Sequence, residues 1–373
     1  MKGLNKIWLI IIIASVIIIG VALYFSWQFI FPTETPTPTP TNNTGTLPNG
    51  DDAGLTPPTQ ANDQSTATRQ KLSIISKSQA SHYWVERESN EVFYFDTDGF
   101  LHKIGQNQDI KLDMQAINNI AWVKSSADGK MTIVSFGSPN ATLVIFDTES
   151  STYKQLPNNT TSSAWDPESN NRVAILRQNN SDSIISIFNI STGRISNIVS
   201  LTQYDLEVDW PLANKIHLAS KPSANYNSSL WSVDTSNGRV QNIISDLSGL
   251  MTKWSPDGQS GLMFAAKSFQ LIDASGNSLI RWGFVTLPSK CTMGNSRGYC
   301  AVPKSVSGAT LPDDYLQKSK ALDDNIYEVD FATGIATIVL ETEQVIDADL
   351  VSFNKNSLFF INRLDGFLYK LAL

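Results

Sequence analysis

The sequence contains little sulfur, little histidine and few charged residues. It has 2 cysteines and 3 histidines among 373 residues, and charged residues make up 17%. The histidines, His82, His102 and His217, are far apart and none has a cysteine or carboxylate at ligand spacing. No run of lysine or arginine occurs, and the formal net charge is −7. We therefore predict no metal, no other cofactor and no nucleic-acid partner.

One long apolar run is present, from residue 7 to residue 31, broken only by two serines, a glycine and a glutamine. At ~1.5 Å per residue this run is longer than a ~30 Å hydrocarbon core, whereas the apolar part of a signal peptide has ~7–15 residues. Lys2 and Lys6 precede it, and only Glu34 follows it closely. This charge bias predicts a cytoplasmic N-terminus. We predict a cytoplasmic tip and transmembrane helix in residues 1–31, with a cleaved signal peptide as the alternative.

Residues 32–70 lack aromatic side chains and are rich in proline, threonine, asparagine and aspartate. Such a segment buries too little apolar surface to offset the entropy of folding. Alternating proline and threonine favour an extended polyproline II conformation. We predict a disordered stalk here. The membrane is then a partner through residues 7–31, and the chain is a single-pass protein of the cell membrane with everything after the stalk outside the cytoplasm.

An aromatic residue, a tight turn and an apolar strand form the pattern that organises residues 71–373. Its clearest copy is WSPDG at Trp254–Gly258, in which Pro256 sets φ for a turn and Gly258 supplies positive φ. Weaker copies begin at Trp84, Trp122, Trp165, Trp210 and Phe353. The five tryptophans follow one another at steps of 38 to 45 residues (84 to 122, 122 to 165, 165 to 210, 210 to 254). This is the period of a propeller blade.

A second pattern recurs in register with the first. It consists of an apolar residue, any residue and Asp or Asn, then a short turn and another strand, at Asp147, Asn189, Asp234, Asp273 and Asp330. Each unit therefore holds four strands. A further unit begins at Cys291, because the distance from Trp254 to Phe353 is too long for one blade.

The last unit has only three strands, and an unmatched strand at Lys71–Ser76 precedes the first unit. We predict that this strand completes the last blade and closes the ring, which removes both exposed edges. The predicted fold is thus all-β, a seven-bladed β-propeller in residues 71–373 behind the transmembrane helix. Six or eight blades are the alternatives.

Residues 71–373 resemble the TolB-like and WD-repeat-like β-propellers, whose blades carry W-S-P-D-G. Trp254–Gly258 match that motif letter for letter, and the other copies are degenerate. With its anchor and stalk, the whole chain is similar to uncharacterised N-terminally membrane-anchored bacterial propeller proteins. The resemblance implies the fold and brings no established activity, because propellers include enzymes, receptors and scaffolds.

Two motifs point to chemistry, but their contexts do not support it. Gly294–Gly298 reads G-x-S-x-G, but a nucleophile elbow needs a strand before it, a helix after it and a later histidine, and none follows His217. Asp96–Gly99 begins like a calcium loop but lacks the later ligands, and a hairpin turn explains it more simply. We predict that the protein is not an enzyme.

Cys291 and Cys300 are predicted to form a structural disulfide. The predicted topology places them outside the cytoplasm, where disulfides persist. A bridge across this hairpin contributes ~2–3 kcal/mol through loop entropy.

Residues 303–325 interrupt the blade period between the second and third strands of the sixth unit. Long loops in compact domains usually have a use. In a propeller this loop lies beside the other b–c loops, which defines a face with Tyr226, Asp313, Asp314 and Tyr315 as candidate binding residues. We predict a non-catalytic, surface-displayed module or envelope scaffold that binds a protein or glycan there. The alternative is an extracytoplasmic lyase or hydrolase at the central channel, which inward acidic or histidine side chains would favour.

Overall fold

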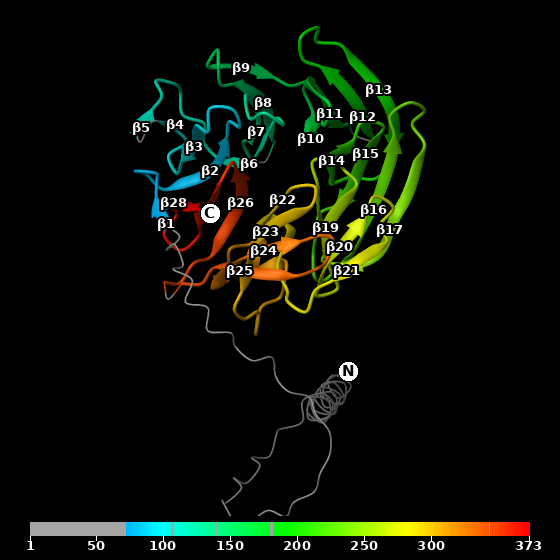
Figure 1. Ribbon diagram of the computed structural model, residues 1–373. Helices are drawn as coiled ribbons and strands as arrows, with labels where there is room; N and C mark the ends of the chain where they lie inside the picture. The colour runs from blue at the N-terminus through cyan, green and yellow to red at the C-terminus, as the bar shows by residue number, and fades with distance from the viewer. Residues whose placement is uncertain (1–71, 106–107, 139, 180–181, 343) are drawn as a thin grey trace, which may run out of the picture. The chain divides into compact units, whose positions relative to one another are not determined.

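The computed structural model describes residues 72–373 apart from 106–107, 139, 180–181 and 343. These residues form seven four-stranded antiparallel sheets arranged in a ring (Figure 1). Within this part of the chain, helical structure is confined to η1 (Pro288–Lys290) and α2 (Asp313–Leu316). The predicted all-β, seven-bladed propeller is therefore confirmed.

The predicted transmembrane helix in residues 1–31 and the stalk in residues 32–70 lie outside the described residues. Among the residues that are described, no helix is long and apolar enough to cross a membrane.

Each of the first six blades is a meander of consecutive strands, with the first strand nearest the ring axis and the fourth on the rim (Figure 1). Blade 1 contains β2 (Ala80–Val85), β3 (Val92–Asp96), β4 (Leu101–Gly105) and β5 (Gln108–Lys111). Blade 2 contains β6 (Ile120–Ser125), β7 (Met131–Phe136), β8 (Thr142–Asp147) and β9 (Thr152–Gln155). Blade 3 contains β10 (Thr160–Asp166), β11 (Ser169–Gln178), β12 (Ser183–Asn189) and β13 (Ile195–Leu201).

The next three blades repeat this order. Blade 4 contains β14 (Leu206–Leu212), β15 (Lys215–Ser220), β16 (Asn227–Asp234) and β17 (Val240–Ser248). Blade 5 contains β18 (Met251–Trp254), β19 (Ser260–Ala265), β20 (Ser268–Asp273) and β21 (Ser278–Arg281). Blade 6 contains β22 (Cys291–Met293), β23 (Arg297–Pro303), β24 (Asp324–Asp330) and β25 (Ala336–Leu340).

Blade 7 is built from both ends of the propeller sequence. Its order is β26 (Ala348–Asn354), β27 (Ser357–Asn362), β28 (Leu368–Ala372) and β1 (Leu72–Ile74), with Leu72 opposite Leu371 and Ile74 opposite Tyr369. The prediction that the early strand completes the last blade is confirmed. Pairing β1 with β28 satisfies backbone groups that would otherwise form a bare edge.

The core consists of apolar clusters between neighbouring blades. Trp84, Phe93 and Phe95 of blade 1, for example, pack against Val134 and Phe146 of blade 2. The second strand of blade 1 is buried at every position, as expected for an apolar run between stacked sheets. Side chains of the tryptophan frame therefore hold one blade to the next.

The turn of the WSPDG motif lies close to the neighbouring blade. Gly258 has φ +66°, and a Cβ built there would lie 2.2 Å from the carbonyl oxygen of Pro211 in blade 4. Only glycine fits both the conformation and the space. The motif therefore serves contact between blades 4 and 5.

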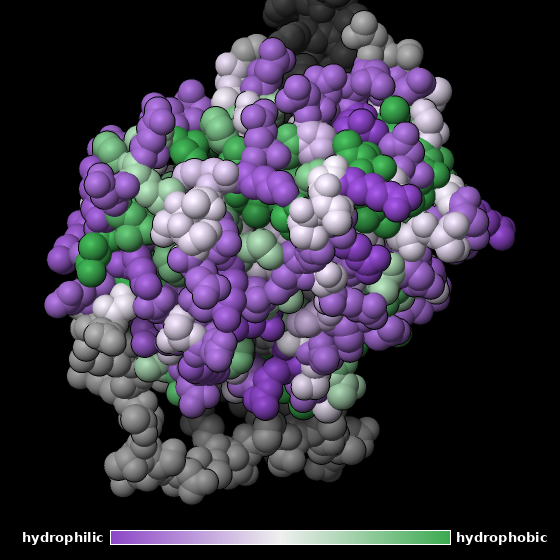
Figure 2. All heavy atoms as spheres, turned by 90° about the horizontal axis from the view of Figure 1, so that it is seen from above, coloured by the Kyte–Doolittle hydropathy of each residue, from purple (hydrophilic) through white to green (hydrophobic). Residues whose placement is uncertain are grey.

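The b–c loops and the connections between blades share one face of the ring, which we call the insertion face. It carries the loop at residues 221–226 and the insertion at residues 304–323. On the side of the molecule seen in Figure 2, hydrophilic residues predominate and hydrophobic ones form small, separate groups.

Candidate ligand-binding site

The insertion connects distant blades. The carboxylate Oδ2 of Asp313 accepts hydrogen bonds from the backbone N–H of Ala224 at 2.9 Å and from Ser223 and Asn225 at 3.3 Å, in the blade 4 loop. In the opposite direction, the Tyr315 hydroxyl donates to Asp349 on β26 of blade 7 at 2.5 Å. Blades 4 and 7 are three steps apart, the largest separation in a ring of seven. The insertion, which starts in blade 6, therefore spans the arc from blade 4 to blade 7 on this face.

Tyr315 does not lie on the surface, where its predicted role as a binding residue would place it. Its side chain is 4% exposed and belongs to the apolar cluster that also contains Leu311 and Leu322 of the insertion. Its ring centroid lies 4.1 Å from Arg363 Cζ and 4.9 Å from Lys290 Nζ. Burial raises the pKa of the Tyr315 hydroxyl well above its usual value. The aromatic ring anchors the insertion to the sheets, and for that reason it points inward.

A buried ionic network lies beneath this ring. Lys290 Nζ contacts Asp347 Oδ1 at 2.6 Å and Asp324 Oδ2 at 2.8 Å, and all three side chains have no exposed surface. Arg363 contacts the other Asp347 oxygen at 3.1 Å. Burial raises the pKa of Asp324 to about 6, although Lys290 favours its charged form. Because Asp324 begins β24, the network fixes the end of the insertion.

The two aspartates predicted as binding residues also have structural partners. Asp313 holds the blade 4 loop, as described above. Asp314 accepts hydrogen bonds from the backbone of Thr310 at 2.7 Å and from the hydroxyl of Ser319 at 3.2 Å, both within the insertion. Tyr226, in contrast, is 75% exposed, on the blade 4 loop at residues 221–226 that Asp313 contacts. Of the four predicted binding residues, it is the one whose side chain is presented to solvent.

Charged and titratable side chains gather near the axis. Burial lowers the pKa of Lys253 on β18 to about 8, although Asp349 and Asp209 act in the opposite direction. Burial and the charge of Lys318 in the insertion lower the pKa of His82 on β2 to about 4. Histidine is therefore neutral there at pH 7, and a fraction of the lysine is unprotonated.

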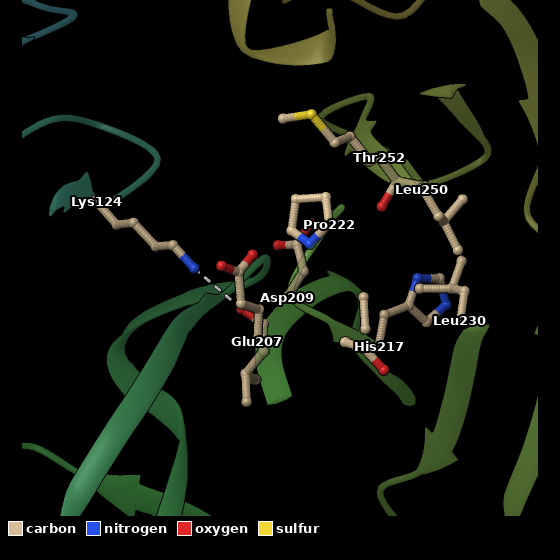
Figure 3. Close-up of a pocket in the computed structure, with 12 residues that line it drawn as sticks. Lys124, Glu207, Asp209, His217, Pro222, Leu230, Leu250 and Thr252 are labelled. Atoms are coloured by element: carbon tan, nitrogen blue, oxygen red, sulfur yellow. Dashed lines mark hydrogen bonds between the residues drawn. The ribbon is translucent and has the colours of Figure 1, made fainter. Parts of the chain in front are cut away.

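A pocket of about 230 Å³ lies between blades 4 and 5. Lys124 of blade 2, whose side chain extends across blade 3, forms one wall, and its Nζ donates to the carbonyl oxygens of Ser163 and Val208 at 3.1 and 3.0 Å. In Figure 3, Glu207 and Asp209 lie next to each other near the centre, and the ring of His217 lies apart from them, toward Leu230. The remaining lining is mainly aliphatic or hydroxylic and comprises Val208, Ala219, Ser220, Pro222, Leu230, Leu250, Met251 and Thr252.

His217 is the most unusual group in this pocket. It is 1% exposed, and neither ring nitrogen has a hydrogen-bond partner. Its ring packs edge-on against Trp254 of blade 5, with 4.7 Å between centroids. Burial lowers the pKa of His217 to about 4, although Asp209 acts in the opposite direction. A buried imidazole without partners leaves hydrogen-bonding capacity unused.

Sequence reasoning did not select Glu207, Asp209 or His217. A signal was present, because Glu207 and Asp209 are two residues apart in a strand and therefore share one face. Sequence reasoning also missed the two carboxylates that contact His102. The ring nitrogens of His102 lie 3.0 Å from Asp96 and 3.1 Å from Asp109, within blade 1. Asp96 Oδ1 accepts two backbone hydrogen bonds in its hairpin turn, which agrees with the structural interpretation of that turn.

Cys291 and Cys300 form the predicted disulfide, between directly opposed residues of β22 and β23 with Cα atoms 4.1 Å apart. The G-x-S-x-G sequence at residues 294–298 forms the turn after β22 and the start of β23, and a strand, not a helix, follows it. Within the described ranges, no group of three His, Cys, Asp or Glu residues is arranged to hold a metal ion.

No family model and no curated protein matches the sequence. Solved structures with a similar fold include an oligogalacturonate lyase in complex with manganese, with TM-score 0.57 and 10% identity over 83% of this chain and 94% of the other. The β-propeller domain of Cps50 (Swd1) from Myceliophteria thermophila gives TM-score 0.54 and 9% identity over 81% and 100%.

Tricorn protease gives TM-score 0.51 and 12% identity, over 82% of this chain and 34% of the protease. The chain thus spans about a third of that protein. At these identities the likeness shows the β-propeller fold alone.

Proposed function

We propose that the protein is a non-catalytic binding module that holds a protein partner on its insertion face, with Tyr226 as the main contact. The observation that carries this proposal is the loop at residues 221–226, which presents an exposed tyrosine while Asp313 holds its backbone. Exposed tyrosines are favoured at binding hot spots. A loop held in one conformation loses less entropy on binding than a free one.

The proposed location is outside the cytoplasm, with the chain anchored through residues 7–31. Two features support it: the length of that apolar run and the disulfide between Cys291 and Cys300, which is typical of oxidising compartments.

The test replaces Tyr226 with a photo-crosslinking phenylalanine analogue in the full-length protein. A matched control carries the same analogue at Ile335, which is 62% exposed in the turn between β24 and β25 on the opposite face. After irradiation of intact cells, we expect a crosslinked protein from position 226 and none from position 335. Equal products from both positions, or none from position 226, would reject a protein partner on this face.

The bracing role of Asp313 is tested with Asp313→Ala. This variant frees the loop but leaves Tyr226 and the buried network in place, so we expect weaker crosslinking and an unchanged melting temperature. A wild-type crosslinking yield would show that the brace does not matter for binding. A glycan partner would give no crosslinked protein while oligosaccharide binding remained sensitive to Tyr226→Ala.

A second candidate function is a lyase acting near the axis. The observation that favours it is the group formed by Lys253, His82 and Asp349, because a lysine with a pKa of about 8 can act as a general base near neutral pH. Oligogalacturonate, the substrate in the name of one structural neighbour, is a direct probe. Unsaturated product from wild type and none from Lys253→Met would replace the binding function with catalysis.

A further inference from the structure

The pocket between blades 4 and 5 lies against an unusually polar face of blade 4. Asp209 is directly opposite His217 on the neighbouring strand, and His217 is opposite Ser232. Residues opposed in this way have Cβ atoms ~4.5–5.5 Å apart and share one face of the sheet. This row therefore carries a carboxylate, an imidazole and a hydroxyl where the face meets blade 5.

A second row runs beside the first, with Glu207 opposite Ala219 and Ala219 opposite Leu230. On the second strand of blade 5, the positions equivalent to His217 and Ala219 are occupied by apolar residues. There, Leu262 is opposite Lys253, and Phe264 is opposite Met251. Blade 4 thus has histidine in place of leucine and alanine in place of phenylalanine. These smaller or polar side chains leave the space between the blades that the pocket occupies.

Charge in the pocket is unbalanced. Glu207 and Asp209 are both exposed, whereas the one ammonium group, that of Lys124, donates to two backbone carbonyls. One carboxylate oxygen of Asp209 accepts the backbone N–H of Trp210 at 2.9 Å. The buried His217 ring adds two nitrogens without hydrogen-bond partners. The pocket lining therefore offers an added cation two carboxylates and an imidazole nitrogen as acceptors.

The rest of the lining restricts the body of such a ligand. Pro222, Leu230 and Leu250 are aliphatic, and no aromatic ring other than the imidazole lines the pocket. Sugars and aryl groups usually bind against aromatic faces, whereas an alkyl chain packs well on aliphatic side chains. The small volume admits a short chain.

We propose that this pocket binds a primary alkylammonium group, with the ammonium between Glu207, Asp209 and His217 and the alkyl chain against Leu230 and Leu250. Neutral imidazole supplies an acceptor, and the two carboxylates supply charge. The same chemistry is offered by a free short-chain amine and by a lysine side chain of a bound protein. This site is separate from Tyr226, so it does not depend on the proposed function.

The first test measures binding of pentylamine by calorimetry at pH 7.5, with pentanol as the neutral match. We expect pentylamine to bind at least tenfold more tightly than pentanol. Equal binding would overturn the proposal, because it would show an apolar cavity without recognition of the ammonium group. The absence of pentylamine binding would overturn it as well.

Variants then locate the site. Asp209→Asn and Glu207→Gln remove charge at exposed positions, and each is expected to weaken pentylamine binding at least tenfold. Ala219→Leu fills the pocket and is expected to abolish binding. Glu149→Gln, at an exposed turn of blade 2, is the control and should bind as wild type does. Unchanged affinity in Asp209→Asn with a wild-type melting temperature would reject the assignment.

Two further ligands distinguish the sources. Diaminopentane represents a free amine, and Nα-acetyl-lysine methylamide represents a lysine side chain in a protein. Tighter binding of the lysine derivative would assign the pocket to a partner's lysine, and tighter binding of the diamine would assign it to a small molecule. Tyr226→Ala should leave pentylamine affinity unchanged, so failure of the partner-binding function and failure of this site are distinguishable.

Discussion

At the residue scale, His217 makes the protein sensitive to acid. Its folded-state pKa of about 4 is below the usual value of 6.5, so the unfolded chain binds a proton more readily between these two pH values. The associated stability is fully present above pH 6.5 and is lost as the pH falls through 4. The full shift corresponds to about 3 kcal/mol.

We therefore predict that His217→Gln reduces the loss of unfolding free energy between pH 6.5 and pH 4. Urea denaturation at a series of pH values measures this. Asp324, whose pKa is raised, changes stability in the opposite sense over part of this range, so the comparison is made between the variant and wild type at each pH. Parallel pH profiles for the two proteins would contradict the assignment to His217.

Lys290 is the second residue with a large expected effect. Removing the cation in Lys290→Met leaves the carboxylates of Asp324 and Asp347 buried without their main partner, and this costs about 3–5 kcal/mol. The control is Lys304→Met, whose ion pair with Asp323 has side chains 34% and 37% exposed. Such a pair contributes about 0–1 kcal/mol. Urea denaturation of both variants tests the contrast, and similar midpoints would show that burial of the network does not matter.

At the element scale, the short strand β1 has an importance out of proportion to its length. Three register pairs join it to β28. In addition, the backbone N–H of Ile75 donates to the carbonyl oxygen of Leu368, and the backbone N–H of Leu368 donates to the hydroxyl of Ser76. Without it, blade 7 would have three strands and a bare edge.

We predict that deleting residues 72–76 lowers the melting temperature by several degrees or more, whereas deleting residues 33–68 leaves it unchanged. A loss of even ~2 kcal/mol is a visible shift in a domain of this size. The two truncations are compared by calorimetry in the same buffer. Equal melting temperatures would mean that β1 does not stabilise the ring.

At the scale of the whole molecule, the insertion links sheets that the ring itself keeps apart. It contacts the loop of blade 4 through Asp313 and the inner strand of blade 7 through Tyr315. The hairpin beneath it pairs as far as Pro303 and Asp324, so the sheet does not need the insertion for its register. The insertion instead contributes apolar side chains and the links to blades 4 and 7.

The topology of the chain gives a prediction at the same scale. Protease added to intact cells should release a soluble fragment that begins within residues 32–70, because the stalk is predicted to be unfolded and outside. Immunoblotting against the propeller detects the fragment, and a cytoplasmic protein serves as the control for lysis. A fragment that appears only after lysis would show the opposite orientation.

By itself, the sequence determined the propeller fold, the closing strand and the disulfide, and it favoured seven blades over six or eight. The physical reason is that turn residues and strand periodicity are local properties, and each repeats in every blade. Trp254–Gly258 and its degenerate copies marked where inner strands end and turn into the second strands. The three-strand last unit showed what Lys71–Ser76 had to pair with. Cys291 and Cys300 were the only possible partners for each other.

Only the tertiary structure decided which side chains meet across blades. Tyrosine is a residue type that is common at binding surfaces. Tyr315 is nevertheless buried, against Lys290 and Arg363, which come from other segments of the chain. His217 is unremarkable in the sequence, because its lack of partners follows from the packing of Trp254 and the register opposite Asp209. Such contacts depend on how whole sheets stack around the axis, and no local pattern records them.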